Sequence, residues 1–232
     1  MIQVIRSGDR YHHQTDWLST YWHFSFDHYW DPDNVAFGTL RVFNDDVIQP
    51  GTGFPPHGHR EMEIITYVLE GELEHEDDQG NRGLLRAGQV QVMSAGTGIV
   101  HAERNPSTTV PLHLLQIWIL PRTKRLRPRW EQRKFTAAER RGRLFPVVSA
   151  NAERDCLRID QHATIFVSAL DPGQAVTQPL APGRRAYLFA ISGALDLNRI
   201  PLSAGDQARV ADESPLPLTA TAPTELILLD LP

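Results

Sequence analysis

The sequence predicts an all-β protein built from two successive β-barrel or β-sandwich units. Short runs of β-branched and aromatic residues, separated by Gly, Pro, Asn and Asp, recur along the 232-residue chain. A basic segment at residues 121–143, with ten Lys or Arg and two Glu, interrupts these runs. The runs on its two sides resemble each other in order and spacing. Many short strands joined by glycine-rich turns are typical of sandwiches and barrels.

Six runs are expected to form the principal strands. In chain order they are FGTLRVFND (37–45), MEIITYVLEG (62–71), HLLQIWILP (113–121), TIFVSAL (164–170), RAYLFAISG (185–193) and ELILLDL (225–231). Helical character in the middle of the chain is confined to residues 136–143, after the run WEQRKF.

The two halves of the chain indicate an internal duplication. YVLEGELEH (67–75) is matched by FAISGALDL (189–197), and LLRAGQVQVM (84–93) is matched by PLSAGDQARV (201–210). Each pair has a strand, a glycine turn, a second strand and a further glycine turn. We therefore expect an N-terminal unit at 1–120, a connecting segment at 121–143 and a C-terminal unit at 144–232.

Composition excludes several classes of protein. Hydrophobic residues make up 41% and charged residues 22%, which is ordinary for a globular chain and excludes general disorder. No apolar run approaches the roughly 20 residues of a membrane span, and the first residues lack a secretory signal. The net charge of −5 argues against direct nucleic-acid binding. The single cysteine, Cys156, excludes an intrachain disulfide, so we expect a cytoplasmic protein without a membrane partner.

Histidine is concentrated in the N-terminal half, where nine of the ten lie at or before His113. His57 and His59 are two residues apart, as are His101 and Glu103. Side chains alternate along a strand, so each pair projects to one face. On facing strands the two pairs would converge as three imidazoles and one carboxylate. That donor set suits a divalent transition metal and leaves coordination positions open.

The glycine spacing around these pairs matches the two cupin signatures, GX5HXHX3-4EX6G and GX5PXGX2HX3N. The first runs from Gly51 to Gly71, with one extra residue before the closing glycine. The second ends at His101 and Asn105, with Ser94 in place of proline and two extra residues before the histidine.

The surrounding sequence resembles the pirin family, and especially its bacterial members that act as quercetin 2,3-dioxygenases. The resemblance is dense over residues 15–121 and looser in the second half. It is carried by WHFSFDHYWDP, LRVFNDD, HGHREMEIITYVLEG, MSAGTGIVHAERNPS and LHLLQIWILP. It implies two tandem cupin barrels of the jelly-roll type, a bicupin, of which the second has lost its metal site.

The resemblance also implies the site and the reaction. The metal ligands would be His57, His59, His101 and Glu103, whereas Glu63, a ligand in many other cupins, would not be one. We expect one divalent transition metal per chain, iron first, with zinc, copper, nickel, cobalt and manganese also compatible. The substrates would be a flavonol such as quercetin and O2. Glu103 is the expected base for the flavonol 3-hydroxyl, with Glu63 as the alternative.

Two other functions compete with this prediction. A pirin can instead act as a metal-binding regulatory module that binds a transcription factor or a metabolic enzyme. A non-oxidative cupin such as an isomerase would need a phosphate or sugar site, and the sequence has none. We expect a monomer.

Other histidines and aromatic residues are expected to have structural roles. The histidines are His23, His28, His75 and His113. The aromatic cluster, expected to form core packing and part of the pocket wall, consists of Trp17, Tyr21, Trp22, Phe24, Phe26, Tyr29 and Trp30.

Overall fold

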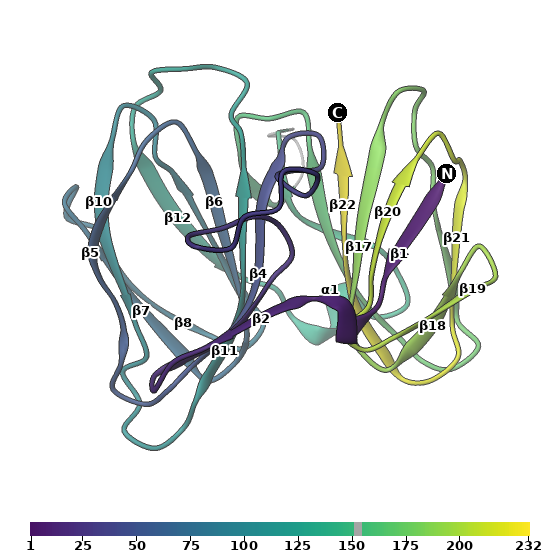
Figure 1. Ribbon diagram of the computed structural model, residues 1–232, viewed down its shortest axis with the longest axis horizontal. Coiled ribbons are helices and arrows are strands. Elements are labelled where there is room, and N and C mark those ends of the chain that lie inside the picture. The colour runs from purple at the N-terminus through teal and green to yellow at the C-terminus, as the bar shows by residue number, and fades with distance from the viewer. Residues whose placement is uncertain (151–154) are drawn as a thin grey trace. The chain divides into compact units, whose positions relative to one another are not determined.

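The computed structural model describes residues 1–150 and 155–232, and almost all of its regular structure is β-strand (Figure 1). The chain forms two compact units. The N-terminal unit contains residues 11–134 and 157–161, and the C-terminal unit contains residues 1–10, the described residues of 135–156, and residues 162–232. The first ten residues therefore belong to the C-terminal unit.

The N-terminal unit consists of two antiparallel sheets that face each other (Figure 1). In order, the larger sheet contains β12 (Arg129–Lys134), β9 (Gln89–Ser94), β6 (Glu63–Glu70), β11 (Leu112–Ile119), β4 (Leu40–Ile48), β3 (Leu18–Trp22) and β2 (Tyr11–Gln14). The smaller sheet contains β5 (Gly53–His59), β10 (Ile99–Arg104), β7 (Glu72–Asp77) and β8 (Arg82–Arg86). The two-residue strand β14 (Leu157–Arg158) also belongs to this unit.

The C-terminal unit repeats this arrangement. Its larger sheet contains, in order, β1 (Ile2–Ile5), β20 (Gln207–Ala211), β17 (Arg185–Ser192), β22 (Thr224–Leu231), β15 (Thr164–Leu170) and β13 (Phe145–Ser149). Its smaller sheet contains β16 (Ala175–Gln178), β21 (Leu216–Ala220), β18 (Ala194–Leu197) and β19 (Ile200–Ser203). A 3-10 turn, η1 (Ser7–Asp9), follows β1, and the helix α1 (Ala137–Arg140) begins at a capping box between Thr136 and Glu139.

The strand orders confirm the internal duplication. The series β9-β6-β11-β4 corresponds to β20-β17-β22-β15, and β5-β10-β7-β8 corresponds to β16-β21-β18-β19. Gly71 and Gly193 occupy equivalent turns, with φ of 78° and 76°. A Cβ atom there would lie 2.5 Å from the carbonyl oxygen of Pro111 and 2.0 Å from that of Pro223, respectively. Both turns therefore require glycine.

The six strands expected from the sequence form the centres of the two larger sheets. They correspond to β4, β6, β11, β15, β17 and β22, whose residues are mostly buried. The all-β class and the jelly-roll arrangement are confirmed. Within each unit the two sheets lie face to face as a sandwich and do not close into a barrel. The helical segment expected near residues 136–143 forms only the single turn α1.

The interiors of the two units differ in polarity. The C-terminal unit encloses a large apolar cluster that includes Leu188, Leu195, Leu218 and Leu228. Its strands β16 and β21, equivalent to β5 and β10, have the sequences AVTQ and LPLTA. The equivalent interior of the N-terminal unit contains buried histidine, glutamine and carboxylate side chains, which the next subsection describes.

Among the residues that the structure describes, no helix is long and apolar enough to cross a membrane.

Candidate metal centre

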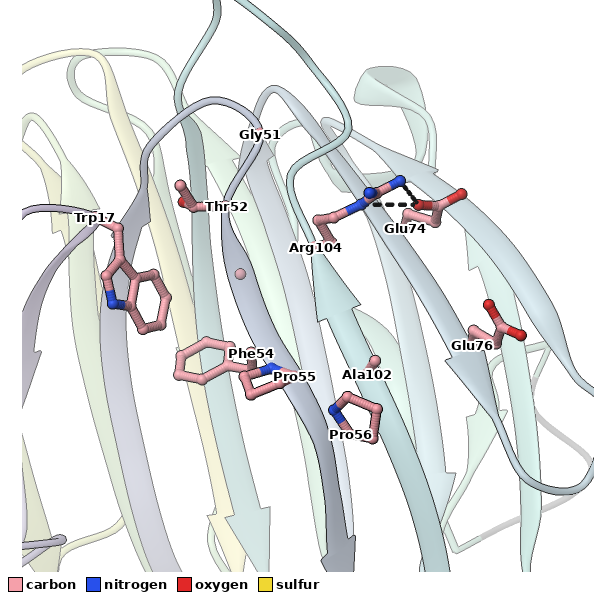
Figure 2. A pocket seen from close by; sticks show the side chains of 11 residues that line it. Trp17, Gly51, Thr52, Phe54, Pro55, Pro56, Glu74, Glu76, Ala102 and Arg104 are labelled. Atoms are coloured by element: carbon pink, nitrogen blue, oxygen red, sulfur yellow. Dashed lines mark hydrogen bonds and ion pairs between the residues drawn. The ribbon is translucent and has the colours of Figure 1, made fainter.

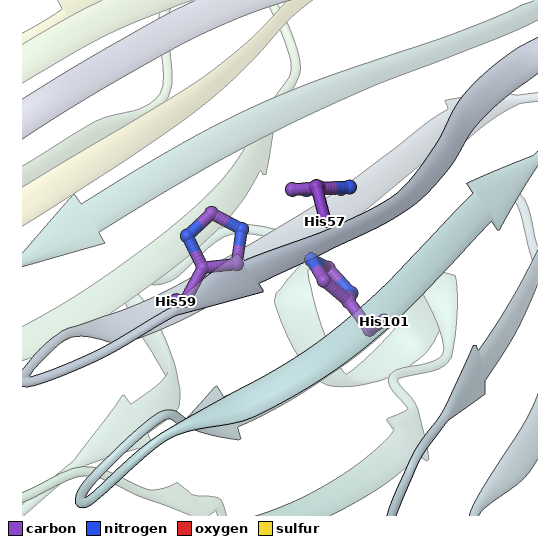
Figure 3. A group of neighbouring side chains, drawn as sticks. All are labelled: His57, His59 and His101. Carbon is purple, nitrogen blue, oxygen red and sulfur yellow. The ribbon is translucent and has the colours of Figure 1, made fainter.

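Pairing of β5 with β10 brings three histidines together in the N-terminal unit. His57 lies directly opposite His101, and His59 lies opposite Ile99. The three imidazoles point toward one another, with ring centroids 4.5–5.0 Å apart (Figure 3). One ring nitrogen from each of His57, His59 and His101 lies within 4.8 Å of the others. Strand alternation accounts for this cluster, as the sequence spacing predicted.

The imidazoles present nitrogen lone pairs to the centre of the cluster. His57 Nδ1 lies 2.8 Å from the carbonyl oxygen of Pro55 and donates to it, which leaves Nε2 as an acceptor. His101 Nε2 is buried and has no hydrogen-bond partner in the described part of the chain. Burial and the neighbouring imidazoles lower the pKa of His59 to about 4 and that of His101 to about 3. These two imidazoles are therefore neutral at pH 7, as metal binding requires.

Glu103 lies beside this cluster, two residues beyond His101 and after a bulge in the pairing of β10 with β5. Its carboxylate is 4.8 Å or less from ring nitrogens of His101 and His75, which form a second group of candidate ligands with it. Gln91 Nε2 and Thr66 Oγ1 donate to Oε1 at 2.6 and 3.3 Å, and Gln116 Nε2 donates to Oε2 at 2.8 Å. Three polar side chains thus hold the carboxylate in place.

A cavity of about 660 Å³ opens onto the histidine cluster. Its volume lies in the usual range for small-molecule sites. Its walls include part of the aromatic cluster predicted from the sequence. The apolar lining residues are Trp17, Leu18, Trp22, Phe26, Phe54 and Trp118.

The floor of the cavity carries polar residues that the sequence analysis did not single out. Asn44 and Asp46, on β4, line it together with Gln116. Asp46 is 3% exposed and accepts a hydrogen bond from Thr20, and burial raises the pKa of its carboxyl to about 7. The alternation in LRVFNDD was the available signal, because it places Asn44 and Asp46 on one face and Asp45 on the other.

The remaining candidate residues lie outside this cavity. Glu63 is buried and accepts a 2.6 Å hydrogen bond from Ser94. Glu61, which has the same strand parity as His59 and Glu63, accepts a hydrogen bond from the backbone nitrogen of Arg125. His113 Nε2 lies 2.7 Å from Asp45. Neither glutamate nor His113 lines the cavity as the described residues form it.

The opposite face of the smaller sheet forms a separate, open pocket of about 630 Å³ (Figure 2). It shares Trp17 and Phe54 with the inner cavity, and on β10 it is lined by Ala102 and Arg104, which alternate with His101 and Glu103. Arg104 pairs with Glu74 at 2.7 Å. This pocket contains none of the four expected ligands, so we assign the candidate site to the inner cavity.

The donor set fits a divalent transition metal. Borderline metals accept imidazole nitrogen and carboxylate oxygen, and a buried lone pair without a partner, such as that of His101 Nε2, is costly unless it binds something. In this arrangement His57, His59 and His101 can each contribute one nitrogen, whereas Glu103 groups with His101 and His75 and not with His57 and His59.

Comparison with known proteins extends these observations. The family model described as Pirin matches residues 5–119, and the model described as Quercetinase C-terminal cupin domain matches residues 146–231. The chain is 40% identical to quercetin 2,3-dioxygenase of Escherichia coli K12, covering 100% of this chain and 99% of that protein. It is 43% identical to a pirin-like protein of Caulobacter vibrioides, covering 92% of each chain.

A solved structure supports the same relationship. The crystal structure of the bacterial pirin YhhW of Escherichia coli in complex with nickel(II) superposes with a TM-score of 0.95 at 40% identity. The match covers 100% of this chain and 99% of that one.

Proposed function

Because this chain belongs to the pirin family, we propose that it is a metal-dependent dioxygenase that cleaves flavonols such as quercetin with O2. The relative in Escherichia coli that matches over the full length bears the name quercetin 2,3-dioxygenase. The observation that carries the proposal is that a cluster of three imidazoles borders a cavity of about 660 Å³ whose apolar walls include Trp17, Trp22, Phe26, Phe54 and Trp118. A flat polyphenol requires walls of this kind.

We propose that His57, His59, His101 and Glu103 hold one divalent transition metal per chain. The related bacterial pirin binds nickel(II), and the donor set also suits iron, which we propose as the native metal. A carboxylate has about four acceptor positions, and Gln91 and Gln116 take two on Glu103. The single Thr66 hydroxyl hydrogen is directed to Glu103 Oε1 at 3.3 Å or to Gln116 Oε1 at 3.1 Å. The other positions can accept a metal ion or a proton.

The residues of the cavity then bind and orient the flavonol. When bound, the metal supplies Lewis acidity that favours ionisation of a hydroxyl placed against it. Glu103, as a ligand or after partial release, is the proposed acceptor of the 3-hydroxyl proton, because its carboxylate lines the cavity beside His101. Trp22, Phe26 and Trp118 offer faces and edges for stacking on the rings.

The balanced reaction consumes one flavonol and one O2 and releases carbon monoxide and a depside. Asn44, Asp46 and Gln116 supply polar groups on the cavity floor for the other hydroxyls of the substrate. We further propose that the protein works in the cytoplasm as a monomer.

Oxygen uptake by the metal-loaded protein tests this function. Flavonols with a free 3-hydroxyl should be consumed with release of carbon monoxide, and flavones that lack this hydroxyl should not. His57→Ala and His101→Ala should each lose most of the bound metal while remaining folded, since the apolar strands of the sandwich do not depend on the ion. His113→Ala, outside the cavity, is the matched control.

Absence of oxygen uptake with every flavonol, in protein shown to carry its metal, would contradict the enzymatic function. The family's other activity, binding of a regulatory or metabolic protein, would then be the function to test.

A further inference from the structure

His75 lies beside His101 in the interior of the N-terminal unit, with ring centroids 5.3 Å apart. It is fully buried on β7, where it pairs in register with Glu103, and it does not line the cavity. Its Nδ1 lies 3.4 Å from His101 Nδ1, and its Nε2 lies 3.3 Å from Asp77 Oδ2. The ring stacks on Trp130, with centroids 4.9 Å apart and planes within 8°. Asp77, His75 and His101 therefore form a continuous, buried series of hydrogen bonds.

Only one arrangement of protons satisfies this series when His101 Nε2 is a metal ligand. His101 must then carry its proton on Nδ1 and donate it to Nδ1 of His75. His75, having used Nδ1 as an acceptor, must carry its own proton on Nε2 and donate it to Asp77. An ionised Asp77 can only accept, which matches the last position in the series.

Asp77 is itself fixed by its own turn. Its carboxylate accepts hydrogen bonds from the backbone nitrogens of Gln79 and Asn81 and from Asn81 Nδ2, at 2.9–3.1 Å. Although burial opposes it, these bonds lower the pKa of Asp77 below its ordinary value. The Asp77 carboxylate, which ends this series of hydrogen bonds, is therefore ionised at neutral pH.

We propose that His75 and Asp77 are positioning residues for the metal: they hold His101 in the Nδ1-protonated tautomer and increase the electron donation of its Nε2. Hydrogen bonding of a ligating histidine to a second group orients the ring and increases its basicity, and loss of such a partner weakens metal binding about 10–100-fold. The inference rests on the proposed ligand role of His101 and is independent of the substrate.

Nitrogen-15 NMR of the metal-free protein tests the tautomers directly. Ring-nitrogen correlations, assigned with the His75→Phe and His101→Ala variants, should show His101 protonated at Nδ1 and His75 protonated at Nε2. Protonation of His101 at Nε2, or of His75 at Nδ1, would overturn the proposal.

Nickel affinity, measured by competition with a chelator, tests the consequence. His75→Phe keeps a flat ring to stack on Trp130 but removes both nitrogens, and Asp77→Asn removes the charge and replaces one acceptor oxygen by an amide donor. Both should bind nickel about 10–100-fold more weakly than the parent protein. The matched control is His113→Phe, which breaks the His113–Asp45 pair outside the cavity and should leave the affinity unchanged.

X-ray absorption at saturating nickel separates positioning from ligation. The number of histidine nitrogens on nickel should be the same in His75→Phe as in the parent protein. Loss of one nitrogen would make His75 itself a ligand, in the group with His101 and Glu103, and would overturn the proposal. Unchanged nickel affinity in both folded variants would also overturn it. None of these measurements depends on flavonol turnover, so failure of the dioxygenase proposal would be recognised separately.

Discussion

Asp46 and Glu103 line the same cavity, but their carboxyl groups have different hydrogen-bonding environments. Three side chains donate to the Glu103 carboxylate, whereas Asp46 accepts from Thr20 and lies in a site where burial dominates. Desolvation penalises the charged form of a carboxyl group unless donors compensate. The two residues are therefore suited to different tasks, and each can be tested by an amide substitution that keeps its shape.

Glu103→Gln should lower the turnover of flavonols by about 100-fold or more, because it removes a ligand charge and the proposed proton acceptor. Turnover is measured as oxygen uptake at saturating flavonol, with metal content determined on the same samples. Glu63→Gln is the control, since Glu63 is a buried carboxyl that binds Ser94 outside the cavity. Full activity of Glu103→Gln would point to another base.

Asp46→Asn should change how the stability of the metal-free protein depends on pH. The pKa of Asp46 is raised from 3.8 to about 7, so the folded state holds more protons than the unfolded state between these values. The free energy of unfolding therefore falls as the pH rises from about 4 to 7, by about 4 kcal/mol at most. The amide variant should lack this fall. Urea unfolding of both proteins at pH 5 and pH 8 measures the difference, and parallel profiles would contradict the prediction.

At the scale of elements, the approach of β5 to β10 decides where the ligands lie. A Cβ atom at Gly53 would lie 2.3 Å from the carbonyl oxygen of Glu103 and 2.6 Å from the Cα of Arg104. No side chain can be accommodated there without moving one strand from the other. Gly58, on the same strand between His57 and His59, has its nearest neighbour at 3.9 Å.

Gly53→Ala should therefore destabilise the protein by about 1–3 kcal/mol, the usual cost of overpacking, and should weaken nickel binding because Glu103 is displaced. Gly58→Ala, the matched control, should change neither quantity appreciably. Urea unfolding and chelator competition measure the two effects. Equal behaviour of the two variants would show that the close approach at Gly53 does not position the site.

At the scale of the whole molecule, the two units share one strand order, but their interiors differ in polarity. β5 and β10 present histidines and Glu103 to a cavity, whereas the equivalent β16 and β21 contribute Val176, Leu216 and Leu218 to an apolar cluster. Among the residues that the structure describes, both groups of candidate metal ligands lie in the N-terminal unit.

Nickel should therefore bind at one ion per chain and stabilise one unit only. Hydrogen exchange followed by mass spectrometry should show slower exchange with nickel at residues 53–59 and 99–104. Exchange at residues 175–178 and 216–220 should not change, because a ligand protects the structure that it binds. Two ions per chain, or protection of the second set of strands, would contradict this prediction.

The sequence by itself determined the class of fold, the duplication and the histidine pairs. Central strands are buried on both faces, so β6 and β22 appear as continuous apolar runs that can be recognised without a partner. The spacing of His57, His59 and His101 was equally informative, because alternation along a strand is a local property. By contrast, β5 has the sequence GFPPHGH, whose prolines and glycines give no strand signal of their own.

Only the tertiary structure decided which of the remaining polar residues surround the site. His75, Gln91 and Gln116 lie far from one another in the sequence. They meet at His101 and Glu103 because β7 pairs with β10 in the smaller sheet, while β9 and β11 belong to the larger sheet that faces it. The assignment of residues 1–10 to the C-terminal unit likewise depends on the pairing of β1 with β20. Contacts of this kind depend on register and on the packing of one sheet against another, and no local pattern of residues specifies them.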